Sequence, residues 1–340
     1  MAPMPVQPEA MPALPSDRDS KILPRPGIHS ASGGAIPGLD EVPAWVLSAR
    51  EPSAIPVLIA VPHAGRHYPG EVGERLRNPA HAALRLEDRM VDRLGEAVAA
   101  RTGASLLVAQ APRAMIDLNR APDDVDWSMF VREAGEAERP APPPGARAAG
   151  GLGIVPRRLP GVGELWKHPH RRSELEARIA QVYRPYHEAL ARQLARLRKR
   201  WGAALLLDLH SMPPVALRGS AAAPEFVVGD RFGASCAGTL TALAFAWFAQ
   251  GGRLAAHNRP YAGGHALDTH ANPRRGVHAF QLEIDRSRYL DADLLEPGPG
   301  FAAMAEHLAG LVRTLAAEVA AMGRQGGRGS GLQGWAEAAE

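Results

Sequence analysis

Four short apolar segments constrain the fold of this chain more than any other feature. The segments are residues 55–65, 104–113, 203–211 and 278–286. Each runs into polar or glycine residues, which is typical of strands that are buried on both faces. Helical patterns lie between or after them, at 79–103, 173–202, 233–252 and 300–323. This alternation predicts an α/β fold with a mixed, mostly parallel sheet and helices on both faces.

Composition narrows the class of protein. The 340 residues are 46% hydrophobic and 22% charged, which suits a globular chain with a large core. The 39 basic residues nearly balance 36 acidic ones, and no basic block stands out, which argues against nucleic acid as a partner. No stretch reaches the ~18 apolar residues of a membrane span. The single cysteine, Cys236, excludes an internal disulfide and a cysteine-based zinc site, and fits the cytoplasmic location that we expect.

Composition also suggests where the folded part begins and ends. Residues 1–40 are rich in proline and lack the apolar core of a secretory signal, so they predict a disordered leader. The glycine-rich residues 324–340 predict a disordered tail, which leaves one catalytic domain over 41–323. Within it, the Pro/Gly/Ala-rich insertion 133–163 is too long for a plain connection. Such a loop is either mobile or part of an active site.

Polar residues follow three of the four expected strands. His63, His210 and Glu283 lie at or near the carboxyl ends of strands, where ligands bind in open parallel sheets. Two imidazoles and a carboxylate are a common set of catalytic zinc ligands. Asp208 and His210 share one face of their strand, so Asp208 is a candidate for orienting a histidine ligand. Taken singly, His63 can equally be a loop histidine that bonds to nearby backbone.

Carboxylates for such a site come from two segments. Glu87, Asp88 and Asp92 lie in one helical pattern and supply candidates for the third ligand. The alternative for these three is a solvated acidic face paired with neighbouring arginines. Glu283 has apolar neighbours, which raise the pKa of a carboxyl toward neutrality and suit a general base. The alternative for Glu283 is a salt bridge to an arginine just after the strand.

Arginine dominates the candidates for substrate binding. Arg113 and Arg120 follow the second strand, and planar guanidinium groups bind carboxylates through two hydrogen bonds. Arg113 can also form an ordinary surface ion pair. The segment 258–276 contributes Gly264, where the backbone can approach a ligand closely, together with His265 and Arg274. The side chains of His265 and Arg274 either face the ligand or lie exposed on a surface loop.

Taken in order, a series of short motifs resembles the N-formylglutamate amidohydrolase family over roughly residues 50–315. The motifs are PHAG, EDRMVD, IDLNRAP, GLGIVPR, PYH, LDLHSMP, NRPYAGGHA and FQLEIDRSRYL. The family is similar in architecture to the zinc carboxypeptidases and aspartoacylases. The resemblance therefore implies a zinc carboxypeptidase-like sheet and a hydrolase that acts on a linear amide bond.

The resemblance also implies roles for individual residues. His63 and His210 would bind zinc, Asn119 and Arg120 would bind a carboxylate of the substrate, and Glu283 would be the base. The related peptidases carry an acidic ligand three residues after the first histidine. Arg66 stands at that position here, so we assign the acidic ligand to Asp88 instead.

The activity that the resemblance implies is hydrolysis of N-formyl-L-glutamate to formate and L-glutamate, as in histidine degradation. Zn²⁺ is the expected cofactor, although the same donor set accepts iron, cobalt or manganese. One alternative is a zinc deacylase for another N-acyl acidic amino acid or a peptidoglycan amide. Another is a non-catalytic module that binds acidic amino acids. In each case the expected partner is a small acidic molecule, while the oligomeric state stays open.

Overall fold

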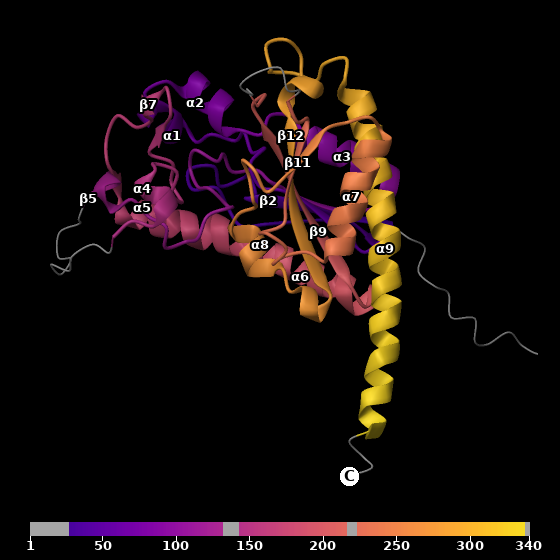
Figure 1. Cartoon of the computed structure of the whole chain (residues 1–340). Coiled ribbons are helices and arrows are strands. Elements are labelled where there is room, and N and C mark those ends of the chain that lie inside the picture. The colour runs from indigo at the N-terminus through magenta and orange to yellow at the C-terminus, as the bar shows by residue number, and fades with distance from the viewer. Residues whose placement is uncertain (1–26, 132–142, 216–222, 337–340) are drawn as a thin grey trace, which may run out of the picture.

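An eight-stranded sheet organises this protein, whose computed structural model describes residues 27–131, 143–215 and 223–336 (Figure 1). The strand order is β1-β2-β4-β3-β9-β12-β10-β11. The bounds are β1 Gly27–Gly33, β2 Trp45–Glu51, β3 Val57–Val61, β4 Ser105–Ala109, β9 Ala204–Met212, β10 Phe226–Gly229, β11 Ala255–His257 and β12 Val277–Asp285. The four strands expected from the sequence are β4, β3, β9 and β12, which form the middle of the sheet.

The central strands run parallel, as the sequence predicts. The pairs β4–β3, β3–β9, β9–β12 and β10–β11 are parallel, and β1–β2, β2–β4 and β12–β10 are antiparallel. The mixed, mostly parallel sheet is therefore confirmed. Every residue of β3, β4 and β9 is buried, because helices cover both faces of the sheet.

Helix α6 (Arg184–Trp201) lies on one face of the sheet. The opposite face is covered by α3 (Val91–Thr102), α7 (Gly238–Gln250) and α9 (Phe301–Ala336). On the α6 side, Leu58 packs in one core cluster. Its neighbour Ile59 belongs to the second cluster, together with apolar residues of α3, α7 and α9. This division follows from the alternation of side chains along a strand. Helices α7 and α9 run side by side (Figure 1).

The expected helix 79–103 is in fact two helices, α2 (Pro79–Leu86) and α3, separated by Glu87–Met90. Glu87 is extended and Met90 takes a left-handed conformation with φ of 58°. Two groups that lie just beyond the ends of strands distant in the sequence stabilise the break. Arg286 donates to the carbonyl oxygens of Leu84 and Glu87 at the end of α2, and the amide of Asp88 donates to the carbonyl oxygen of His63 at 2.9 Å. The break therefore places Asp88 against the end of β3.

The remaining helices and small sheets surround this framework. They are α1 Gly70–Arg75, α4 Ala146–Ala149, α5 Arg172–Arg178, a π-helical turn Ile179–Tyr183, α8 His265–His270, the pair β5 Phe130–Val131 with β8 His170–Arg171, and the pair β6 Arg158–Leu159 with β7 Gly163–Glu164. The expected helix 173–202 corresponds to α5, the π-helical turn and α6. No helix in the described ranges is both long and apolar enough to cross a membrane.

Both predicted domain boundaries need correction. Strand β1 lies within the leader that was expected to be disordered, and it pairs with β2 along its whole length. Its side chains are exposed or half-buried, so backbone hydrogen bonds hold it and composition gives no signal. At the other end, α9 continues past residue 323 to Ala336. Residues 1–26 and 337–340, like residues 133–142 of the insertion 133–163, lie outside the described ranges.

Candidate metal centre and active site

His63 and His210 meet at the carboxyl end of the central strands. His63 lies two residues beyond the end of β3, and His210 lies near the end of the adjacent strand β9. Both are buried, and their ring centroids are 4.8 Å apart with an angle of 61° between the rings. Two histidines that are 147 positions apart in the sequence thus share one site because their strands are neighbours.

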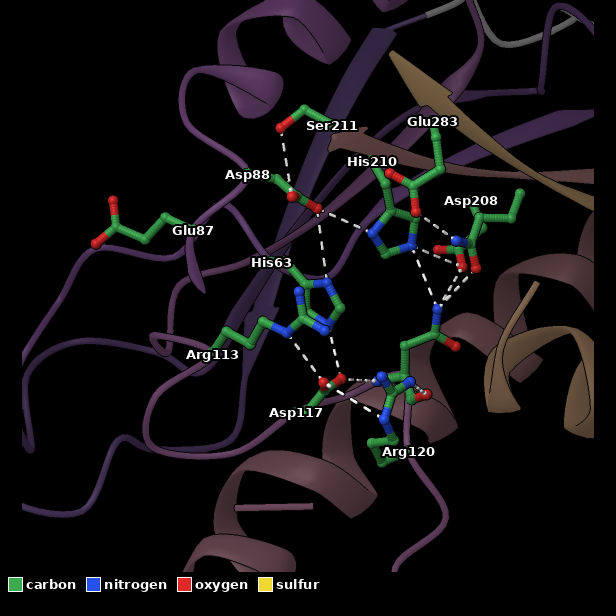
Figure 2. A network of polar contacts seen from close by, with 12 residues as sticks. His63, Glu87, Asp88, Arg113, Asp117, Arg120, Asp208, His210, Ser211 and Glu283 are labelled. Atoms are coloured by element: carbon green, nitrogen blue, oxygen red, sulfur yellow. Dashed lines mark hydrogen bonds and ion pairs between the residues drawn. The ribbon is translucent and has the colours of Figure 1, made fainter. Parts of the chain in front are cut away.

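Asp88 lies between the two imidazoles (Figure 2). Its Oδ2 atom is 2.9 Å from His210 Nδ1 and 3.6 Å from His63 Nδ1. One ligand atom from each of the three residues lies within 4.8 Å of the other two. The structure therefore brings together the three residues predicted as metal ligands, and this group can hold a metal ion.

The other nitrogen of each imidazole bonds to a carboxylate. His63 Nε2 donates to Asp117 Oδ1 at 2.7 Å, and His210 Nε2 donates to Asp208 Oδ2 at 3.0 Å. A proton on Nε2 leaves the Nδ1 lone pair available on the side that faces Asp88. His63 Nδ1 is buried and has no hydrogen-bond partner among the described residues. A buried acceptor without a donor fits a site for a cation.

Only one of the three acidic candidates in 87–92 reaches the site. Asp92 forms a bidentate ion pair with Arg66, at 3.0 and 2.6 Å. Glu87 accepts hydrogen bonds from Tyr68 and Arg89. Arg66, which replaces the acidic ligand of the related peptidases, therefore serves to hold helix α3. Burial raises the pKa of Asp88, but the hydrogen bond with His210, and the positive charge of the two histidines when they are protonated, bring it below its usual range.

Glu283 lies on β12 directly beside His210 of β9. Its side chain is buried, and burial raises its pKa to about 7, with a further contribution from the charge of Asp88. Gln281 Nε2 donates to Glu283 Oε1 at 2.7 Å. The alternative salt bridge to an arginine is not formed in the described ranges, because Arg286 bonds to the end of α2 and to Ser211. A carboxyl that titrates near neutrality beside a cation site can act as a base.

These groups line a pocket of about 260 Å³. Arg113, Arg120, Asn119 and Gly264, all predicted as substrate-binding residues, line it as well. Arg113 and Arg120 flank Asp117: Arg113 Nε donates to Asp117 Oδ2 at 2.9 Å, and Arg120 Nε lies 3.9 Å from the same oxygen (Figure 2). Burial alone would raise the pKa of Asp117, but Arg113, His63 and Arg120 hold it well below its usual range. The carboxylate stays ionised and orients these three groups.

Asn119 organises the pocket wall. Its Nδ2 donates to Asp208 Oδ2 at 3.2 Å and to Gln281 Oε1 at 3.0 Å, while its Oδ1 accepts from the backbone N–H of Ala266 at 2.9 Å. A Cβ atom on Gly264 would come within 2.4 Å of the Asn119 amide, so only glycine fits there. The amide of Asn119 thus connects β9, β12 and α8, and the predicted contact of Asn119 with a substrate carboxylate stays a prediction.

Two predicted substrate-binding residues lie away from the pocket. Arg274 is in a short 3₁₀ helix that precedes β12, so it lies at the opposite end of that strand from Glu283. The ring of His265 bonds to Thr269 within α8. Neither residue is among the described residues that line the pocket. The sequence predicts one loop over 258–276, but helix α8 divides it, and the residues of this segment that line the pocket are 261–264, which precede α8.

The described pocket lining also contains residues that were not predicted as site residues, among them Arg85, Arg147, Tyr261, Gln281 and Arg286. Arg147 belongs to the insertion that composition already singled out, which is the one signal that could have found it. Arg286 comes directly after the end of β12, and the sequence suggested it only as a salt-bridge partner. Arg85 and Tyr261 carry no distinguishing local pattern.

The model of the N-formylglutamate amidohydrolase family matches residues 55–290 of this sequence. The chain belongs to that family. Its N-formylglutamate deformylase relative from Pseudomonas aeruginosa is 32% identical over 277 residues, which cover 80% of this chain and 95% of the relative. The deformylase from Pseudomonas putida is 32% identical over 243 residues, covering 70% and 82% of the two chains.

One solved structure agrees with this assignment, and a second shares the fold. The N-formylglutamate amidohydrolase from Ralstonia eutropha JMP134 superposes with a TM-score of 0.72 at 30% identity, over 83% of this chain and 99% of that one. A protein from Agrobacterium tumefaciens shares the fold, with a TM-score of 0.55 at 20% identity, over 81% of this chain and 96% of that one. The resemblance inferred from the ordered motifs is confirmed.

Proposed function

We propose that this protein is a metal-dependent hydrolase that cleaves N-formyl-L-glutamate to formate and L-glutamate. The observation that carries the proposal is the arrangement of His63, Asp88 and His210 around one point, next to Glu283. Family membership and two deformylase relatives support the choice of substrate. Zn²⁺ suits a set of two imidazoles and one carboxylate with room for a further ligand.

A divalent cation held by these three residues would polarise the formyl carbonyl and lower the pKa of a water there toward ~7. Glu283 would take a proton from the attacking water as its oxygen bonds to the formyl carbon, because a carboxyl with a pKa of about 7 is partly ionised at neutral pH. The same carboxyl then donates the proton to the departing amine nitrogen. Asp117 and Asp208 keep the imidazoles in the tautomer that presents Nδ1.

The wall made by Arg113 and Arg120 supplies positive charge beside this centre. Arg113 uses Nε to bond Asp117, which leaves its two terminal nitrogens for an anionic oxygen in the pocket. Arg120 is held by the carbonyl oxygens of Leu152 and Asn119. We assign Arg113 to the carboxylate nearest to the scissile amide. The formyl group is small, so binding of carboxylates must orient the bond.

The test combines metal analysis with formate release. We expect about one divalent metal per chain and formate production from N-formyl-L-glutamate that stops when a chelator removes the metal and resumes on adding zinc. Glu283→Gln should retain the metal but lose about 100- to 10,000-fold in kcat, as expected for loss of a general base. Activity that is indifferent to metal, or a fully active Glu283→Gln variant, would refute the mechanism.

A substrate panel distinguishes the alternatives. The pocket of about 260 Å³ favours a small acyl amino acid over a peptidoglycan fragment. We therefore expect N-formyl-L-glutamate to react faster than its N-acetyl and N-succinyl analogues. Faster turnover of a larger acyl group would replace the deformylase assignment by a deacylase. Binding without turnover of any of the three would favour the non-catalytic module.

A further inference from the structure

The insertion that precedes α5 forms one wall of the pocket, and its backbone is attached to the segment that carries Arg120. The amide of Asp117 donates to Ile154 O at 2.7 Å, and Arg120 Nε donates to Leu152 O at 2.9 Å. The amide of Leu152 in turn donates to Arg147 O at 2.9 Å. Through these bonds the insertion presents the side chain of Arg147 to the same pocket as Arg120.

A second bond fixes the helix on which Arg147 lies. The backbone N–H of Ala148, in α4, donates to Asp124 Oδ1 at 3.1 Å. Asp124 also accepts, through its backbone carbonyl oxygen, from the amide of Ile154 at 2.8 Å. The backbone around Arg147 is thus connected to the segment 117–124 at three points.

Five arginines line the pocket, and they differ in how they are bonded. The five are Arg85, Arg113, Arg120, Arg147 and Arg286. Arg286 bonds to the end of α2, Arg120 bonds to two backbone carbonyl oxygens, and Arg113 bonds to Asp117. Arg147, which is exposed, makes no side-chain hydrogen bond or ion pair within the described ranges, and the same holds for Arg85. Both keep their full hydrogen-bonding capacity for a ligand.

The charge of Arg147 acts on Arg120. Asp117 raises the pKa of Arg120, whereas burial and the neighbouring charges of Arg113 and Arg147 lower it. Two like charges that face one pocket repel each other, and an anion placed between them relieves the repulsion. The outer part of the pocket is therefore suited to a carboxylate in addition to the one at the Arg113 wall.

The apolar lining beside Arg147 matches the rest of the side chain of glutamate. Leu152 and Leu159, both in the insertion, line the same pocket. Glutamate places two methylene groups between its α-carbon and its second carboxylate. A pocket lined both by leucine side chains and by a guanidinium that makes no other bond in the described ranges fits that chemistry.

We propose that Arg147, together with Arg120, binds the side-chain carboxylate of the substrate, with Leu152 and Leu159 against its methylene groups. This assignment rests on the proposed function and deepens it. It makes the insertion the element that selects acidic over neutral N-formyl amino acids. Arg147 touches the end of the substrate remote from the scissile bond, so it acts on specificity rather than on the chemical step.

The test compares N-formyl-L-glutamate with N-formyl-L-glutamine, which has the same shape without the second charge. Arg147→Ala should lower kcat/KM for the glutamate compound about 10-fold or more, mainly through KM, and change that for the glutamine compound less than about threefold. Arg147→Lys should restore part of the preference, because lysine supplies the charge but not the two-pronged geometry.

Two matched variants separate the role of Arg147 from those of its surroundings. Arg85→Ala removes the other unbonded pocket arginine, and Arg158→Ala removes an arginine of the same insertion that is not among the described lining residues. Both should preserve the preference for glutamate. Equal losses for the two substrates in Arg147→Ala, or a selective loss in either matched variant, would overturn the assignment.

A binding measurement makes the result independent of turnover. Calorimetric titration of Glu283→Gln protein with N-formyl-L-glutamate should show about 10-fold weaker binding when Arg147→Ala is added. Unchanged affinity refutes the subsite. Wild-type protein that binds with the expected Arg147 dependence but releases no formate would instead refute the proposed function and leave the subsite standing.

Discussion

Among the described residues, two pairs of histidines have ring centroids about 5 Å apart, and their surroundings give them opposite chemistry. His63 and His210, 4.8 Å apart between ring centroids, each bond to a carboxylate through Nε2 and face Asp88 with Nδ1. His187 of α6 and His270 of α8 stack with centroids 5.1 Å apart and an angle of 10°. These two bond directly to each other, with 2.8 Å between His187 Nδ1 and His270 Nε2.

In the second pair, the hydrogen-bonding groups of His187 are satisfied by His270 and by the backbone. His187 Nε2 donates to the carbonyl oxygen of Leu118 at 3.0 Å, so its Nδ1 is left as the acceptor of the proton of His270. Burial lowers the pKa of His187 to about 3 and that of His270 to about 4, so both stay neutral. Proximity of two imidazoles is therefore not sufficient for a cation site. What distinguishes the first pair is a shared carboxylate on one side and separate carboxylates on the other.

The largest effect is the expected difference between substituting a histidine of the first pair and substituting one of the second. His210→Ala should abolish the bound metal and lower kcat/KM for N-formyl-L-glutamate by about 1,000-fold or more, because the ligand set is lost. His270→Gln should retain about one metal per chain. Elemental analysis and a formate assay measure both outcomes. Loss of the metal in His270→Gln, with retention in His210→Ala, would reverse the comparison.

An intermediate effect is expected from the carboxylate that orients His210. Asp208→Asn should weaken metal affinity about 10- to 100-fold, since the amide no longer fixes the imidazole tautomer. Asp268→Asn, whose carboxylate pairs with Arg231 at an exposed position, is the matched control and should leave the affinity unchanged. Competition with a chelator of known affinity gives both values. If Asp208→Asn binds metal as tightly as wild type, the carboxylate does not distinguish the two histidine pairs.

The smallest effect concerns the neutral pair. Folding lowers the pKa of His270 from 6.5 to about 4. Between pH 6.5 and about pH 4, the unfolded chain therefore binds a proton at His270 that the folded protein does not bind. The free energy of unfolding should therefore decrease on acidification through this range, with a contribution from His270 of up to about 1 kcal/mol per pH unit. Above pH 6.5 this contribution is fully present.

Urea unfolding at pH 7, 6 and 5 tests this slope. His270→Gln should show a weaker pH dependence than wild type, while a control such as His81→Gln, on the exposed face of α2, should not. Identical slopes for wild type and His270→Gln would mean that this pair is not held neutral by burial.

Much of the site was predictable from local sequence patterns. The apolar segments that became β3, β4, β9 and β12 determine strands through hydrophobicity alone, and their polar ends identify His63, His210 and Glu283. The topological rule that ligands bind at the carboxyl ends of parallel strands then brings these residues to one edge. Family motifs added Asp88, which the local pattern could not separate from Glu87 and Asp92.

Other features depend on partners that are remote in the sequence. Strand β1 is held by backbone pairing with β2, which leaves no trace in composition. Arg274 looked equivalent to Arg113 but lies at the wrong end of β12. The role of Arg147 depends on where the insertion is attached, and this was not visible in a Pro/Gly-rich segment.

The sequence by itself determined the central strands, the residues at their ends and, through ordered motifs, the family. The family motifs pointed to Asp88 as the acidic ligand, but only the tertiary structure decided how it reaches the two imidazoles while Glu87 and Asp92 bond elsewhere. The helix that carries Glu87, Asp88 and Asp92 is interrupted at that point partly because Arg286, 199 residues after Glu87, bonds to its carbonyl oxygen. A break stabilised across such a distance is a property of the packed chain, because no local propensity requires it.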